Sequence, residues 1–175
     1  MPFGSHSALA DITQLVCFTN PKSVLDIGIG NGMNGAMIRN YCGFDRTLVG
    51  VEAFTDYDNP MWDLYDAVHI KTIQEYEPVN KFNCIICTDV IEHFDKHEGI
   101  EQIARWKKWL EPMGALFIST PSVWIEQGAA GGNVYETHRS LWTEQDFKNL
   151  GFTIYRDGKP CKYGHMMIVA EYLNR

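Results

Sequence analysis

The sequence has no long apolar run and no basic segment at its N-terminus. No stretch of its 175 residues approaches the ~18 consecutive apolar residues that a membrane-spanning helix requires. The first 19 residues also lack the basic start of a secretory signal peptide. Repeats, low-complexity tracts and linkers are absent as well. We therefore expect a cytoplasmic protein without a membrane span, folded as one domain over residues 1–175.

Basic residues are few relative to acidic ones. Lys and Arg number 15 against 22 Asp and Glu, which gives a formal net charge of −7. This excess of negative charge disfavours a phosphate backbone as partner, so binding to nucleic acid is not expected. Hydrophobic residues make up 45% of the chain, enough for a substantial core. A domain of this size buries about 70% of the surface that its unfolded chain exposes.

The cysteines do not have the spacing of a metal site. They number five, an odd count, and we expect them to be reduced, which favours a reducing compartment. Two of them are separated by two isoleucines within a predicted strand, where residues three apart point to opposite faces. That pair is predicted to be buried, and no metal site is expected. The five are Cys17, Cys42, Cys84, Cys87 and Cys161.

The most informative segment is VLDIGIGNG at residues 24–32, in which a buried-strand pattern runs into a glycine-rich turn. Glycine adopts positive φ and lets a ligand approach the backbone closely. The spacing is G-x-G-x-G, whereas a dinucleotide loop with G-x-G-x-x-G would place its third small residue at Met33. Asp26, just before the loop, suits a ligand with a positive ammonium better than one with two phosphates. The segment therefore predicts a nucleotide-type ligand other than NAD at the carboxyl end of this strand.

A carboxylate ends the second predicted strand. Glu52 closes the apolar run at residues 47–51 and lies 24 positions after Gly28. A carboxylate at this place accepts hydrogen bonds from both hydroxyls of a ribose in dinucleotide folds. The alternative is a solvated acid at a strand end, which the glycine loop upstream disfavours.

With these residues, the chain resembles the class I S-adenosylmethionine-dependent methyltransferases. Four segments carry the resemblance in the order and spacing of that family: VLDIGIGNG, LVGVE, the strand pattern at 82–88 followed by DVIEHF, and LEPMGALFISTPS at 110–122. Within the family the chain is most similar to small, uncharacterised single-domain members, through the patterns at residues 127–142 and 146–152. That closer likeness identifies no substrate.

Strand and helix patterns alternate, which predicts an α/β fold: a Rossmann-like, doubly wound sheet with helices on both faces. The resemblance implies seven strands, mostly parallel, with an antiparallel last strand. We expect an N-terminal helical extension over residues 1–22 and a substrate-side loop over residues 120–142. Thr143 should cap the last helix, with Asp146 in its first turn and Gly151 at its end. The predicted strands cover residues 24–28, 47–52, 67–70, 82–88, 114–119, 152–157 and 166–172, and the predicted helices cover residues 7–18, 32–41, 98–110 and 143–150.

The resemblance implies that S-adenosylmethionine binds at the carboxyl ends of the strands, near the reversal of strand order, and leaves as S-adenosylhomocysteine. The glycine loop would hold the methionine part, and Asp26 would orient the loop or the ammonium group. The loop residues expected to bind are Gly28, Gly30, Asn31 and Gly32.

The adenosine half is expected between the ends of the second and third strands. Where the family often has an acid that receives the adenine amino group, this sequence has Thr72. Recognition of adenine is thereby left to the backbone, to Thr72 or to Gln74. The residues expected to hold the adenosine are Glu52, Ala53, Phe54, Thr72 and Ile73.

The fourth strand ends at Asp89 and Val90, a position that lines the reactive end of the cofactor in the family. Glu92 and His93 follow as the closest titratable groups, although His93 equally suits a structural role that pins the loop. A sulfonium is already a strong methyl donor, so positioning of the acceptor carries most of the rate. A general base matters for a hydroxyl or a protonated amine, and the candidates are His93, His138 and Glu136.

Residues 120–142 are expected to determine substrate choice. The segment is long, and GAAGGN at 128–133 has the composition of a lid. It also places aromatic, acidic and basic groups at the opening of the predicted site: Tyr135, Glu136, His138 and Arg139.

The tryptophans are mostly predicted to be structural. Trp106 and Trp109, three apart, indicate helix packing, and Trp142 is expected in the core. Trp62 and Tyr65, in the insertion at residues 55–66, either pack over the adenine side or simply bury their rings.

The sequence thus predicts a methyltransferase that acts on an O- or N-nucleophile of a small polar acceptor. One alternative is a non-catalytic scaffold or partner subunit that keeps the fold, an alternative that Thr72 leaves open. The other is an NAD-dependent oxidoreductase, which the glycine spacing and Asp26 disfavour. The sequence predicts no oligomeric state.

Overall fold

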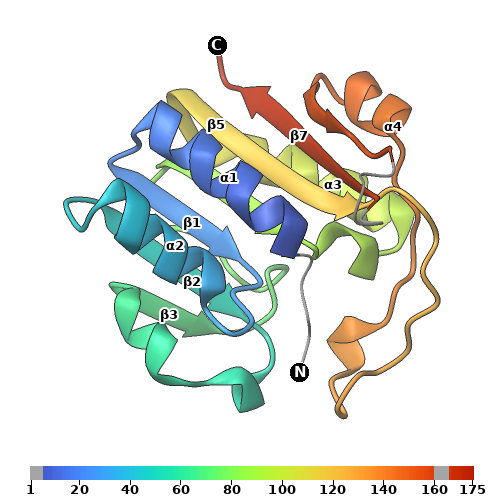
Figure 1. Ribbon diagram of the computed structural model, residues 1–175, viewed down its shortest axis with the longest axis horizontal. Helices are drawn as coiled ribbons and strands as arrows, with labels where there is room; N and C mark the ends of the chain where they lie inside the picture. Colours follow the sequence, from blue (N-terminus) through green and yellow to red (C-terminus); the bar gives the residue numbers. More distant parts are fainter. Residues whose placement is uncertain (1–5, 160–165) are drawn as a thin grey trace.

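The computed structural model describes residues 6–159 and 166–175, which form one seven-stranded sheet with the order β3-β2-β1-β4-β5-β7-β6 (Figure 1). The first five strands are mutually parallel, and β7 runs antiparallel between β5 and β6. This confirms the predicted fold, including the antiparallel last strand. The strands are β1 (Ser23–Ile27), β2 (Thr47–Glu52), β3 (Ala67–Ile70), β4 (Phe82–Thr88), β5 (Leu110–Pro121), β6 (Thr153–Asp157) and β7 (Met167–Leu173).

Helices cover both faces of the sheet, and each face has its own hydrophobic core (Figure 1). One face packs against α1 (His6–Thr19), α2 (Met33–Cys42) and the 3-10 turn η2 (Pro60–Leu64). The other face packs against α3 (Lys96–Lys108) and α4 (Glu144–Asn149). Three further 3-10 turns, η1 (Thr55–Tyr57), η3 (Ile91–His93) and η4 (Val134–Glu136), lie in the connections that follow β2, β4 and β5. None of the described helices has the length and apolarity that a membrane crossing requires.

Strand β4 shows why the sheet is buried on both faces. Cys84 and Ile86 contribute to the core under α1 and α2, whereas Ile85 and Cys87 contribute to the core under α3. The continuous apolar run is therefore typical of a parallel strand covered on both sides. The prediction that Cys84 and Cys87 are buried on opposite faces is confirmed.

Three tryptophans in the core under α3 and α4 are buried, as the sequence predicts. Trp106, Trp109 and Trp142 have exposed fractions of 0%, 5% and 0%. Trp142 also satisfies its indole N–H, which donates to the Ser140 hydroxyl over 2.9 Å. These rings stabilise the fold from within the core.

The start of α4 is a capping box. The Thr143 hydroxyl accepts from the backbone N–H of Asp146, and the Asp146 carboxylate accepts from the backbone N–H of Thr143. Asp146 also pairs with Lys96 of α3 at 2.7 Å. Gly151, just past the helix, has φ +79°, so both predicted boundaries of this helix are confirmed.

The junction between α3 and β5 differs from the prediction. The helix ends at Lys108 and the strand already begins at Leu110, whereas a helix to residue 110 and a strand from 114 were expected. Leu110 pairs with Phe82 of β4, and the Asn174 side-chain amide donates to the carbonyls of Leu110 and Glu111. Tertiary pairing with distant residues therefore lengthens the strand.

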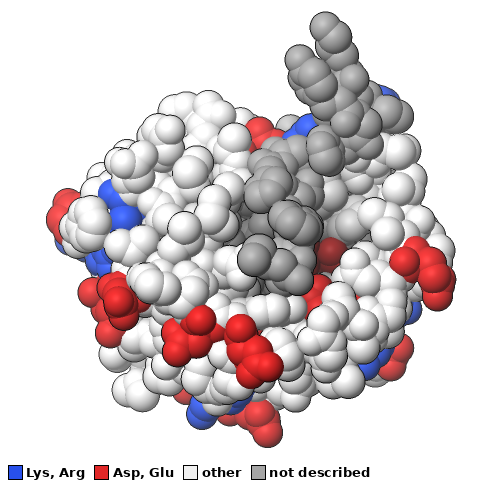
Figure 2. Space-filling model, turned by 60° about the horizontal axis from the view of Figure 1, so that its bottom comes forward, with Lys and Arg blue, Asp and Glu red and all other residues white. Residues whose placement is uncertain are grey.

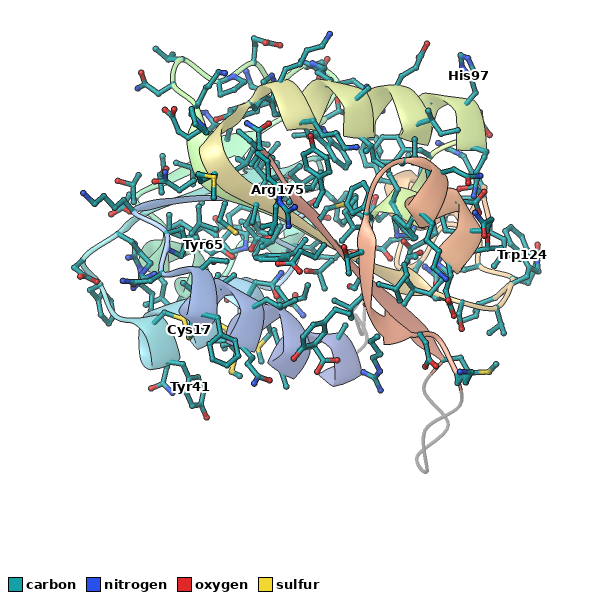
Figure 3. The ribbon with its side chains drawn as sticks, turned by 90° about the horizontal axis from the view of Figure 1, so that it is seen from above. Cys17, Tyr41, Tyr65, His97, Trp124 and Arg175 are labelled. Carbon is teal, nitrogen blue, oxygen red and sulfur yellow. A yellow bond between two sulfur atoms is a disulfide. The ribbon has the colours of Figure 1, made fainter. Side chains whose placement is uncertain are left out.

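The expectation that all five cysteines are reduced is wrong for two of them. Cys17 of α1 and Cys42 of α2 form a disulfide, with their Cα atoms 5.2 Å apart (Figure 3). The two residues are 25 positions apart and meet only because α1 packs against α2, so no local pattern indicates the pairing. Cys161 lies outside the described residues.

Candidate functional site

A cavity of about 720 Å³ opens at the carboxyl ends of β1, β2 and β4. The loops that follow β1, β2, β3 and β4 line it, and residues 121–139 of the long connection after β5 complete the wall. Figure 1 shows that connection passing beyond the carboxyl ends of the strands. The site therefore lies where open α/β sheets bind their ligands.

The glycine loop forms one wall of the cavity. Gly28, Gly30 and Asn31 line it, and the two glycines have φ values of +72° and +49°. A Cβ on Gly28 would meet Val90 Cγ2 at 2.4 Å, whereas a Cβ on Gly30 would meet nothing within 4 Å. Gly28 is thus required for packing, while Gly30 leaves open space for a ligand.

The insertion at residues 55–66 braces this loop from outside the cavity. The Trp62 indole donates to the Gly30 carbonyl over 2.8 Å, and the Asn59 side-chain amide donates to the Asn31 carbonyl over 3.2 Å. Gly32, which was expected to bind the ligand, instead packs against Met61 on this outer side, and a Cβ there would meet Met61 Cβ at 3.0 Å. Trp62 and Tyr65 have exposed fractions of only 8% and 7%. Of the two roles considered for these rings, burial is the one observed.

Asp26 lies behind the loop, outside the set of residues that line the cavity. Its carboxylate accepts from the Tyr65 hydroxyl at 2.6 Å and from the Asn34 side-chain amide at 3.3 Å. Burial raises the pKa of Asp26 to about 7, although both hydrogen bonds act to lower it. This position suits the orientation of the loop rather than contact with an ammonium group.

Glu52 links the end of β2 to the glycine loop. One carboxylate oxygen accepts from the backbone N–H of Gly30 at 2.8 Å, and the other accepts from that of Phe54 at 2.9 Å. Burial raises its pKa above the ordinary value. The backbone of Ala53 also bonds to this carboxylate. A carboxylate has about four acceptor positions, and the residue lines the cavity, so a position that the backbone groups leave free can accept a hydrogen bond from a ligand hydroxyl.

The residues expected around adenine lie at one end of the cavity. Ala53, Thr72 and Ile73 line it, whereas Phe54 does not belong to the lining. Thr72 donates its hydroxyl to Glu75 over 2.9 Å. Gln74 also lines the cavity, and its amide nitrogen donates to Glu98 over 2.8 Å, which leaves the amide oxygen as an acceptor. Phe94, the last residue of the DVIEHF segment, adds an aromatic wall, a role that the sequence analysis did not assign to it.

The other end of the cavity begins where β4 ends. Asp89 and Val90 line it, and Asp89 adopts φ +53° while accepting a hydrogen bond from the Ser119 hydroxyl. Glu92 is 4% exposed and accepts from the Thr120 hydroxyl at 3.0 Å. Burial, followed by the charge of Asp89, raises the pKa of Glu92 well above its ordinary value. The raised pKa favours the neutral form of Glu92 next to the carboxylate of Asp89.

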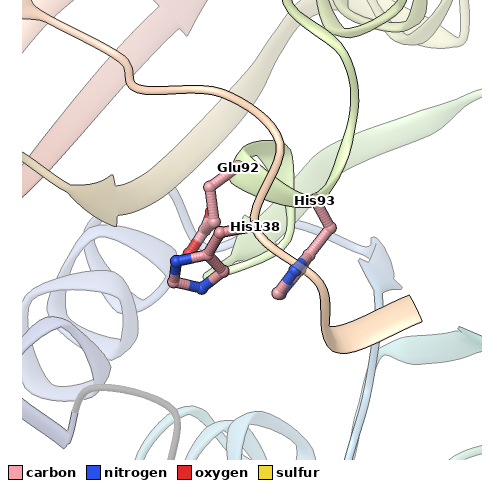
Figure 4. A group of neighbouring side chains, drawn as sticks. All are labelled: Glu92, His93 and His138. Atoms are coloured by element: carbon pink, nitrogen blue, oxygen red, sulfur yellow. The ribbon is translucent and has the colours of Figure 1, made fainter. Parts of the chain in front are cut away.

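Two histidines meet beside Glu92 (Figure 4). The rings of His93 and His138 have their centroids 5.0 Å apart. Nδ1 of His93 bonds to the carbonyl of Thr137 at 3.2 Å, and Nδ1 of His138 bonds to the carbonyl of Ile125 at 2.8 Å. Burial is the main cause that lowers the pKa of His93, which favours the neutral imidazole. His93 therefore joins its own loop after β4, which it was predicted to pin, to the connection after β5, and it also lines the cavity.

Glu136 is held by residues that the sequence analysis missed. It accepts from the Tyr57 hydroxyl at 3.0 Å and from the Gln127 amide at 3.3 Å. The Asn133 amide donates to the same Tyr57 hydroxyl over 3.2 Å. This network ties residues 127–136 to η1, and its only sequence signal is the aromatic residue in the 55–66 insertion.

Acidic groups outnumber basic ones along the cavity. Glu52, Asp89, Glu92 and Glu136 line it, against Lys71 and Arg139. Figure 2 shows the same excess of Asp and Glu over Lys and Arg on the face that it presents. Such a site favours a ligand with positive charge.

Comparison with known proteins adds a family match. The model of a family described as "Methyltransferase domain" matches residues 5–154. No curated protein matches this chain.

Solved structures share the fold at low sequence identity. A 1,6-didemethyltoxoflavin-N1-methyltransferase from Burkholderia thailandensis superposes with a TM-score of 0.70 at 17% identity, over 97% of this chain and 79% of that one. The N-methyltransferase NodS from Bradyrhizobium japonicum gives 0.64 at 12% identity, over 97% and 98%. An O-methyltransferase family protein from Burkholderia thailandensis gives 0.66 at 16% identity, over 95% of this chain but only 55% of that one. This chain thus spans about half the length of the last protein and nearly all of NodS.

Proposed function

Because this chain belongs to the methyltransferase-domain family, whose fold is that of the class I S-adenosylmethionine-dependent enzymes, we propose that it binds S-adenosylmethionine and methylates an O- or N-nucleophile of a small polar acceptor. One observation carries the proposal. A single cavity joins the glycine loop and Glu52 at one end to Glu92, His93 and His138 at the other.

The described residues fit the cofactor. Gly30 lines the cavity and leaves open space there, and a side chain at this position would occupy that space. Glu52 offers an acceptor position to a ribose hydroxyl, and Ile73 and Phe94 offer apolar surface to adenine. The amide oxygen of Gln74 is the acceptor we assign to the adenine amino group, because the amide nitrogen already donates to Glu98 and the oxygen remains an acceptor.

When bound, the cofactor supplies a methyl group activated by the positive charge on sulfur. The chain's own contribution is to position the acceptor and exclude water. Residues 121–139 form the outer wall, held in place by the contacts of Tyr57 with Glu136 and Asn133. Val123 and Ile125 in this wall add apolar surface beside the polar groups.

Candidate general bases lie close to the expected position of the methyl acceptor. The ring of His93 bonds through Nδ1 to the carbonyl of Thr137 and is also held by the backbone of Asp89, and its lowered pKa favours the neutral imidazole. His138 and Glu136 line the same end of the cavity. Any of these groups can take the proton of a hydroxyl or an ammonium acceptor, a role worth about 10²–10⁴ in rate.

The test is methyl transfer from labelled S-adenosylmethionine to a panel of small hydroxyl, amine and carboxylate acceptors. We expect at least one acceptor to be labelled, and we expect Glu136→Gln to lower kcat/KM for it about tenfold or more. Glu126→Gln is the matched control, because Glu126 lies on the same connection but bonds only outward to Trp124. Binding of S-adenosylhomocysteine without labelling of any acceptor would instead support the non-catalytic partner.

A further inference from the structure

Glu92, His93 and His138 bring three potential metal ligands together at the acceptor end of the cavity. Glu92 and His93 are neighbours on η3, and His138 approaches from the connection after β5 (Figure 4). One ligand atom from each residue lies within 4.8 Å of the other two. The three side chains come from segments 45 residues apart, so the fold alone creates the cluster.

Both imidazoles are oriented as metal ligands are. Each bonds through Nδ1 to a backbone carbonyl, His93 to Thr137 and His138 to Ile125. An N–H at Nδ1 that donates to a carbonyl fixes the tautomer and leaves a lone pair on Nε2. Metal-bound histidines almost always have such a partner on the other ring nitrogen.

The carboxylate of Glu92 is also held in place. It is 4% exposed and accepts from the Thr120 hydroxyl at 3.0 Å, which orients the group as an outer-shell partner does. No ion pair found among the described residues includes Glu92. A cation placed between this carboxylate and the two imidazoles would supply the missing positive charge.

We propose that Glu92, His93 and His138 bind one divalent transition-metal ion at the acceptor end of the cavity. Two imidazoles and one carboxylate form the ligand set of catalytic zinc sites and of open iron(II) sites. Bonds of about 2.1 Å in a tetrahedral site place ligand atoms about 3.4 Å apart, so the cluster closes around an ion by side-chain movements of about 1 Å. Glu92 is buried, whereas His93 and His138 are half-buried, and His138 lies on the long connection after β5.

The remaining coordination positions would face the cavity, and because the ion would occupy the lone pairs of His93 and His138, Glu136 would remain as the proton acceptor among the three candidates. If the proposed methyl transfer holds, on which this step rests, an ion here selects acceptors that offer an oxygen ligand, such as a hydroxyl. Cations bound in this way polarise an attached oxygen and lower the pKa of its proton.

The test is a titration of the metal-free full chain with Co²⁺, followed by visible absorption and without methyl donor or acceptor. We expect one bound ion per chain with the d–d bands of a four- or five-coordinate site. Glu92→Gln keeps the shape and the Thr120 hydrogen bond, and we expect it and His138→Ala each to weaken binding at least tenfold.

The matched control is His97→Ala, which removes an exposed imidazole at the start of α3 (Figure 3). Its Co²⁺ affinity should equal that of the unmodified chain. Absence of the absorption bands, or equal affinity in Glu92→Gln, His138→Ala and His97→Ala, would overturn the proposal. Because the titration contains no methyl donor, its failure is distinct from a failure to bind S-adenosylmethionine.

Discussion

Tyr65 donates a 2.6 Å hydrogen bond to the fully buried carboxylate of Asp26, 39 residues earlier in the chain. The same hydroxyl accepts from the backbone N–H of Gly35 at 3.0 Å. One side chain thereby joins the end of β1 to the first turn of α2, and the glycine loop spans the interval between them. The geometry of that loop depends on this buried contact as much as on its glycines.

The stability of the protein should depend on the ionisation of Asp26. Its pKa is about 7 in the fold against an ordinary 3.8, so the folded chain retains a proton that the unfolded chain releases. The protonated carboxyl of Asp26 therefore contributes to the free energy of unfolding below about pH 4, and this contribution is lost as the pH rises through about 7. Relative to Asp26→Asn, the unmodified protein should lose on the order of 4 kcal/mol of unfolding free energy across that range. Urea unfolding at a series of pH values measures the difference, and parallel pH profiles for the two proteins would contradict it.

Two glycines of the loop should respond differently to alanine. In Gly28→Ala the new Cβ meets Val90 at 2.4 Å and the backbone is at φ +72°, so we expect a loss of about 3 kcal/mol in stability. In Gly30→Ala the space is open, and only the positive φ costs about 1 kcal/mol. Chemical denaturation of both variants gives the comparison. Equal losses of stability in the two variants would show that the contact with Val90 does not restrict the side chain at residue 28.

The disulfide should stabilise the fold. Cys17 and Cys42 close a loop of 25 residues, for which the chain-entropy model gives about 3.5 kcal/mol. We expect a Cys17→Ser, Cys42→Ser double variant, or the reduced protein, to lose that amount in urea unfolding. Reductant should leave the double variant unchanged, because the other two cysteines that the structure describes, Cys84 and Cys87, are buried and free. Unaltered stability on reduction of the unmodified protein would contradict the prediction.

Trp62 should affect cofactor binding from outside the cavity. Trp62→Phe removes the 2.8 Å hydrogen bond to the Gly30 carbonyl and keeps most of the ring. A hydrogen bond worth about 1 kcal/mol predicts a roughly fivefold weaker affinity for S-adenosylhomocysteine. Trp124→Phe is the control, since its indole lies at the periphery, donates to Glu126 and packs its ring against His138, away from the glycine loop (Figure 3). A fivefold loss of affinity in Trp124→Phe, or an unchanged affinity in Trp62→Phe, would contradict the role of Trp62 in holding the glycine loop.

Much of the fold was predictable because its signals are local. The glycine loop, the carboxylate of Glu52 and the capping box at Thr143 each depend on residues a few positions apart. The alternation of buried strands and helices then determines the sheet, and the strand ends determine where the cavity opens.

The contacts that complete the site were not predictable in the same way. Tyr57 reaches Glu136 across 79 positions, and Cys17 meets Cys42 only after two helices pack. Sequence analysis considered Trp62 as a cover for adenine or as a buried ring, and only the structure shows that it holds the Gly30 carbonyl. Such contacts follow from how loops pack, which periodicity and spacing do not encode.

The most direct test is calorimetric titration of the purified chain with S-adenosylmethionine and S-adenosylhomocysteine, with NADH as control ligand. Gly30→Arg fills the open space at the loop, and its unfolding should be compared with that of Gly30→Ala to separate blocked binding from lost folding. We predict 1:1 binding of both sulfur ligands, no binding of NADH, and loss of binding in the folded Gly30→Arg variant. Failure of either sulfur ligand to bind the unmodified chain, or equal binding by Gly30→Arg, would contradict the assignment of this cavity to the cofactor.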